Sequence, residues 1–156
     1  MLHSRDCPAV AIYNGVLFVL GGNRGQDFNG QTTEFLNLSQ PGNGWQEGPR
    51  MNHARVGATV LVHGNALYVL GGTVNPLPGE VWHLGNITRP NTGPDMRPWE
   101  ILPSTVTPPR QIGVAVGDSV VFFERNGPGE VRSAATVFRP GRRPTRAPEI
   151  LVQRPL

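Results

Sequence analysis

The chain has 156 residues, a length that suits one domain and is too short for two large ones. It contains 20 Gly and 16 Pro, so we expect many turns and few long helices. The formal net charge is +3, all 14 basic residues are arginine, and the single cysteine, Cys7, excludes an internal disulfide framework. The sequence opens without a signal-peptide pattern and has no apolar run of membrane-spanning length, so we expect a cytoplasmic or nuclear protein.

The first clear element is a hairpin built around the apolar run VLFVL, residues 16–20. Tyr13-Asn14-Gly15 precedes the run and tolerates the positive φ angles of a tight hairpin turn. The run has no polar alternation, which predicts an inner strand that is buried on both faces. Gly21-Gly22 follows and predicts a sharp turn or a close approach of backbone, where a Cβ atom would clash.

Two further strands complete the first unit. Glu34 opens an alternating strand, and Trp45 marks a fourth strand whose indole can fill the space between neighbouring sheets. Arg55 then stands shortly before the next apolar strand. The order within the unit is therefore strand, Gly/Asn turn, apolar strand, Gly-Gly, loop, Glu strand, loop and Trp strand.

The same order returns about fifty residues later. The second copy carries a Gly-Asn turn at residues 64–65, the run ALYVLGG at residues 66–72, then Glu80 and Trp99, with a breaker-rich insertion at residues 86–98. A third copy has an apolar run at residues 119–123 and Glu130, but it lacks the glycine pair and a following Trp strand. Aligning the turn glycines puts Gly15, Gly64 and Gly117 at spacings of 49 and 53 residues. A four-stranded unit with this period is typical of a propeller blade.

These units resemble the kelch repeat, and the best match is MNHARVGATVLVHGNALYVLGG at residues 51–72. The resemblance implies an all-β, partial kelch-type β-propeller of about 2.5 to 3 four-stranded blades. We place the repeats at residues 1–138, with blades at about 5–54, 55–109 and an incomplete 110–138. Kelch domains usually close with about six blades. The chain is therefore expected to be a piece of a propeller, or to complete its ring with another copy or another protein.

The last segment, residues 139–156, breaks the repeat pattern because it is rich in arginine and proline. We expect residues 139–148 to be extended and solvated, and residues 149–152 could form one short strand. Two interpretations stay open. The tail is divergent or disordered, or it makes electrostatic contact with an acidic partner or RNA.

No residue pattern indicates a catalytic or metal site. The histidines lack the spacing of a helical metal site, no cysteine pair is present, and we expect no cofactor. Glu34, Glu80 and Glu130 recur at blade spacing, which indicates a structural role in bonding to backbone or to an arginine of the same blade. The same reasoning favours a structural role for Arg55 and Arg110. Cys7 is expected to be a small buried or half-exposed thiol.

The kelch resemblance implies a binding surface on the loops that join the second to the third strand and on those that join one blade to the next. These loops contain five arginines, so a face that they share is expected to be electropositive and to suit carboxylates. We therefore predict a non-enzymatic interaction module, a scaffold or adaptor piece, that binds an acidic peptide or protein and no membrane, with nucleic acid as a less favoured partner. The alternative is the remnant of an oxidase or carbohydrate-active propeller, similar to galactose oxidase or to a sialic acid mutarotase. The predicted binding residues are Arg24, Arg50, Asn52, His53, Arg55, Arg110 and Arg125.

Overall fold

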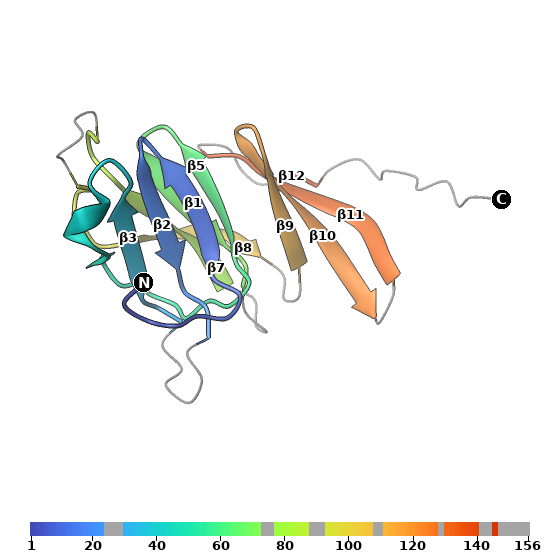
Figure 1. The fold of residues 1–156 in the computed structure, drawn as a ribbon. Helices are drawn as coiled ribbons and strands as arrows, with labels where there is room; N and C mark the ends of the chain where they lie inside the picture. The colour runs from blue at the N-terminus through green and yellow to red at the C-terminus, as the bar shows by residue number, and fades with distance from the viewer. Residues whose placement is uncertain are drawn as a thin grey trace.

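A computed structural model describes the chain at residues 1–23, 30–72, 77–87, 93–107, 111–127, 130–140 and 145–146. Within this part, only the backbone is described for residues 103–107, 111–112, 122–127, 130–137 and 145–146. The described chain forms three four-stranded antiparallel sheets and no α-helix, which confirms the predicted all-β, partial propeller fold (Figure 1).

Each sheet corresponds to one predicted blade. Blade 1 contains β1 (Ala9–Tyr13), β2 (Val16–Leu20), β3 (Thr33–Asn37), a 3₁₀ turn (Pro41–Asn43) and β4 (Gln46–Glu47). Blade 2 contains β5 (Thr59–His63), β6 (Ala66–Leu70), β7 (Leu77–His83) and β8 (Glu100–Thr107). Blade 3 contains β9 (Gln111–Val116), β10 (Ser119–Gly127), β11 (Glu130–Phe138) and β12 (Thr145–Arg146).

The strand order within each blade follows the chain, and the first strands of the three blades lie side by side. β1 contacts β5, and β5 contacts β9, as Figure 1 shows. The sequence predicted a fourth strand at Trp45 and at Trp99. β4 and β8 begin directly after these tryptophans and form the outer edges of blades 1 and 2. β12 adds a fourth strand to blade 3 from within the predicted tail. The boundary of the repeats at residue 138 is therefore too early for this strand, which pairs its backbone with the edge of β11.

The predicted inner strands of the first two hairpins have buried residues on both faces. In β2, Phe18 and Leu20 point to one face and Val19 to the other, and their exposed fractions are 0%, 1% and 3%. β6 repeats this arrangement with Leu67, Val69 and Leu70. Burial on both faces explains the absence of polar alternation in these two strands, because residues of both faces lie away from water.

The hairpin turns correct one detail of the sequence alignment. Tyr13 pairs with Val16 and His63 pairs with Ala66, so Gly64 takes the place of Asn14 and not of Gly15. Asn14, with φ 45°, and Gly64, with φ 56°, both begin their turns in the left-handed region. The repeat distance in the first two blades is therefore fifty residues throughout, from the first turn residue to the glycine pair.

Blade 1 packs face to face on blade 2. We call the face of a blade that points to the next blade in the chain its forward face, and the opposite face its rear face. The forward face of blade 1 presents Ala11 and Phe18, and the rear face of blade 2 presents Val60, Leu67 and Trp82. Phe18 and Trp82 meet edge to face, with ring centroids 5.6 Å apart and planes at 89°. Among the described residues, this joint holds a larger hydrophobic cluster than the joint between blades 2 and 3.

Blade 2 packs on blade 3 through the equivalent faces. The forward face of blade 2 presents Leu61 and Tyr68, and the rear face of blade 3 presents Val120 and Phe138. Tyr68 occupies the position of Phe18, and Phe138 occupies that of Trp82; their ring centroids are 5.9 Å apart. The two joints therefore use the same residue positions.

Candidate binding surface

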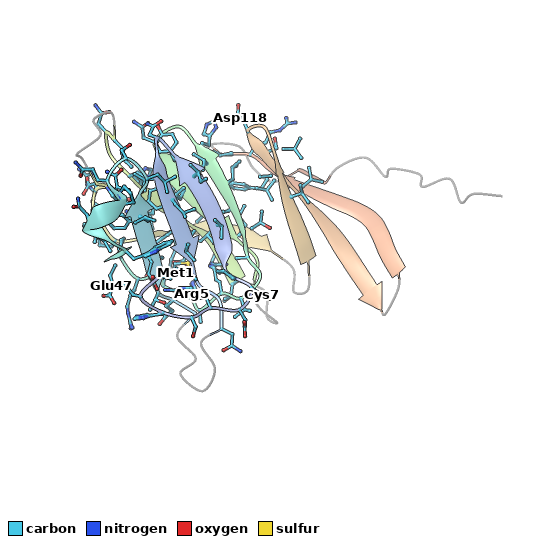
Figure 2. The ribbon with its side chains drawn as sticks, viewed as in Figure 1. Met1, Arg5, Cys7, Glu47 and Asp118 are labelled. Atoms are coloured by element: carbon cyan, nitrogen blue, oxygen red, sulfur yellow. The ribbon has the colours of Figure 1, made fainter. Side chains whose placement is uncertain are left out.

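The strand directions bring the beginnings of several connecting loops to one end of the blades. Gly22 N donates to Arg55 O at 2.8 Å, Val56 N to Gly72 O at 2.6 Å, and Gly57 N to Cys7 O at 2.8 Å. We call the end formed by residues 5–8, 21–23, 50–57 and 71–72 the loop end. Figure 2 shows Arg5 and Cys7 at this end and Asp118 at the opposite one.

Arg55 and Glu80 lie at the centre of the loop end in blade 2. Both side chains are fully buried, and Arg55 Nη2 lies 2.9 Å from Glu80 Oε1. The same guanidinium donates to the carbonyls of Gly71 and Pro78 at 2.8 and 2.5 Å. Every described hydrogen bond of this guanidinium goes to a residue of its own blade, so its charge is neutralised inside the protein.

Asn52 and His53 also bind Glu80. The backbone N–H of Asn52 donates to Glu80 Oε2 at 2.6 Å, and that of His53 donates to Oε1 at 3.1 Å. The Asn52 side-chain amide donates to Oε2 at 2.9 Å and to Trp99 O at 3.0 Å. One buried carboxylate therefore anchors the connection between blades 1 and 2.

The environment of Glu80 keeps its carboxyl group ionised. Burial by itself raises the pKa, but the hydrogen bonds from Asn52 and the charge and hydrogen bonds of Arg55 outweigh it, so the pKa of Glu80 lies below its ordinary value. Burial lowers the pKa of Arg55, and the charge and hydrogen bonds of Glu80 oppose that shift.

Blade 1 contains the same arrangement. Arg5 Nη2 lies 2.6 Å from Glu34 Oε1, and Arg5 Nη1 donates to the carbonyls of Gly21 and Thr32. Leu2 N donates to Glu34 Oε2 at 2.7 Å, as Asn52 N does to Glu80. The structural role predicted for Glu34 and Glu80 is confirmed in full, since each binds both backbone and an arginine of its own blade.

The predicted binding residues differ in their exposure and in whether the structure describes them. Arg55 is only 1% exposed, and including it in a binding surface was wrong, because its guanidinium is enclosed with Glu80. Asn52 and His53 are at the loop end but bound to Glu80, and Arg50 is exposed there. Arg24, Arg110 and the side chain of Arg125 lie outside the described residues.

Two apolar faces, one at each end of the row of blades, have no neighbouring blade in the described chain. The rear face of blade 1 presents Val10 and Ile12, exposed to 52% and 62%, together with half-buried Leu17 and Leu36. The forward face of blade 3 presents Val114 and Val116, exposed to 47% and 60%, together with half-buried Val121. The blade count in the sequence predicted an incomplete ring, but the sequence did not identify these residues.

No metal centre is formed by the described residues, among which no three His, Cys, Asp or Glu side chains come together. Cys7 is exposed, which corrects the expected buried or half-exposed thiol; it lies at a bend just before β1, with φ 51°. In the same part of the chain, no helix has the length and apolar character needed to cross a membrane.

The comparisons with known proteins bear on the fold alone. No family model matches the chain, and no curated protein matches it in sequence. The solved structure of YjhT, a β-propeller protein, is similar with a TM-score of 0.65 at 14% sequence identity. The match covers 96% of this chain and 53% of YjhT, so the chain spans about half the length of that propeller protein.

Proposed function

We propose that this chain is a non-enzymatic interaction module, a kelch-type propeller piece that acts as a scaffold or adaptor and binds an acidic peptide or protein at the loop end. The observation that carries the proposal is the convergence of the connecting loops at one end, where hydrogen bonds between blades join their first residues. Strands fix the positions of such loops, and binding residues are concentrated there in many folds.

The charge of the chain supports an acidic partner. Its basic residues are all arginines, whose planar guanidinium groups suit bidentate binding of carboxylates. Arg50 is exposed at the loop end, whereas the buried arginines of the two repeated ion pairs are already neutralised by Glu34 and Glu80. The proposed surface therefore rests on Arg50, on Arg24 and Arg110 of the predicted loops, and on Arg125 near the end of β10.

Fluorescence anisotropy with a labelled oligoglutamate peptide tests this function, with a neutral Gly/Ser peptide of equal length as a comparison. Arg50→Ala, Arg24→Ala and Arg125→Ala should each weaken binding several-fold, and added salt should weaken it further. Arg97→Ala is the matched control, because Arg97 is exposed and pairs with Asp95 beside the opposite end of blade 2. Equal binding by all four variants would remove the proposal. Copper-dependent oxidation or sugar mutarotation by the purified protein would instead support the alternative enzymatic class.

A further inference from the structure

We infer that the rear face of blade 1 and the forward face of blade 3 bind each other between two copies of this chain, so that two copies close a ring of six blades. The inference concerns a surface away from the loop end and does not depend on the proposed acidic ligand. Its basis is that the chain already builds the same joint twice, between blades 1 and 2 and between blades 2 and 3.

The open rear face has the chemistry of a covered one. Val10 and Ile12 occupy the positions that Val60 and Val62 occupy in blade 2, and those two valines are partly buried against blade 1. Leu17 is half-buried, whereas its counterpart Leu67 is fully buried in the first joint. The same position is therefore apolar in both blades and differs only in whether another blade covers it.

The open forward face matches in the same way. Val114 occupies the position of Leu61, which is only 2% exposed in the second joint, whereas Val114 is 47% exposed. Val121 occupies the position of Phe18 and Tyr68, and Leu36 occupies that of Trp82 and Phe138. The aromatic pair at the centre of each internal joint thus corresponds to an aliphatic pair, Val121 and Leu36, on the two open faces.

The positions that form polar contacts in the two internal joints carry no polar side chain on the open faces. In the first joint Tyr13 Oη donates to Asn65 Oδ1 at 2.5 Å, and in the second His63 Nδ1 lies 3.1 Å from Asp118 Oδ1. The equivalent positions on the open faces hold Val116 and Gly15. Closing the ring at these positions would bury no unpaired polar side chain, which an apolar interface requires.

A head-to-tail joint of this kind either closes into a ring or continues into an open filament. Closure by two copies fits the length of a solved propeller protein, because the chain matches 96% of its own length to 53% of YjhT. Two copies therefore supply about the length of that chain, and each apolar face of one copy meets the complementary face of the other.

Light scattering of the purified chain after size exclusion tests the inference. We expect a particle of twice the 16.9 kDa chain mass, and Ile12→Arg or Val116→Glu should convert it to a monomer with an unchanged circular dichroism spectrum. Both positions are more than half exposed, so the folded blade should tolerate these changes. Met96→Arg is the matched control, since Met96 is 54% exposed and lies outside both faces, and it should remain a dimer.

Mixing the two monomeric variants provides a second, independent readout. A mixed pair keeps one unaltered joint, between the rear face of the Val116→Glu copy and the forward face of the Ile12→Arg copy, so the mixture should regain dimer mass. A folded wild-type monomer, a ladder of species larger than the dimer, or equal masses for the Ile12→Arg and Met96→Arg variants would overturn the inference.

Discussion

Arg55 and Glu80 form a fully buried ion pair at 2.9 Å, and Arg5 and Glu34 repeat that pair at 2.6 Å one blade earlier. In each blade the arginine stands shortly before the first strand and the glutamate lies on the third strand. The arginine also binds the carbonyl of the first glycine of the Gly-Gly pair, Gly21 or Gly71. The pair therefore joins the segment before the first strand, the glycine pair after the second strand and the third strand of one blade.

Removing the arginine of such a pair should destabilise the protein strongly. Arg55→Ala leaves the Glu80 carboxylate buried without its cation, which costs about 3–5 kcal/mol in comparable buried pairs. Urea denaturation followed by tryptophan fluorescence measures the change. Arg97→Ala, which breaks an exposed pair with Asp95, should cost no more than about 1 kcal/mol. Similar losses for the two variants would contradict the role given to Arg55.

The protein should lose stability in acid. The pKa values of Glu34 and Glu80 lie below the ordinary value of 4.5 in the folded chain, so their contribution is complete above 4.5 and is lost as the pH falls through the folded pKa values. The free energy of unfolding, measured in urea between about pH 7 and pH 3, should fall below about pH 4.5. Glu80→Gln should be less stable at neutral pH and show a shallower acid dependence; a parallel curve would argue against this explanation.

Gly72→Ala should destabilise the chain more than Gly57→Ala. Both glycines have φ in the left-handed region, at 77° and 69°, where an alanine costs about 1–2 kcal/mol. A Cβ atom on Gly72 would also lie 2.6 Å from the backbone N of Ala58, whereas one on Gly57 would meet nothing within 4 Å. Thermal melts of the two variants separate backbone strain from the clash. Equal shifts in melting temperature would show that the close approach at Gly72 relaxes at no cost.

Trp82 should contribute more to stability than Trp45. Trp82 is fully buried, packs between Phe18 and Trp99, and donates from Nε1 to Asp95 O at 2.7 Å. Trp82→Ala removes this packing and should cost about 3–5 kcal/mol. Trp45 is half-buried, so Trp45→Ala should cost clearly less in the same denaturation experiment. A larger loss for Trp45→Ala would place the main core of blades 1 and 2 elsewhere.

The repeated strands could be predicted from the sequence because their signals are local. Each hairpin carries its own turn residues, its own apolar run and, in the first two blades, its own glycine pair. The recurrence of Glu34 and Glu80 also indicated their structural role before their partners were known. The turn alignment was wrong by one residue, because an Asn-Gly and a Gly-Asn turn contain the same residue types and only the strand register separates them.

The tertiary structure alone decided which equivalent residues are covered. Arg50 and Arg55 belong to one short connection, yet one is exposed and the other is enclosed by Glu80, which comes from a strand 25 residues later. Val10 and Val60 are both valines and occupy equivalent strand positions. Val60 is partly buried because blade 1 packs against it, whereas Val10 has no described blade beside it. The sequence by itself determined the blade, since turns, strand period and apolar runs act over a few residues. Burial depends on neighbours that are distant in the chain, so the open faces could be identified only from the way the blades stack.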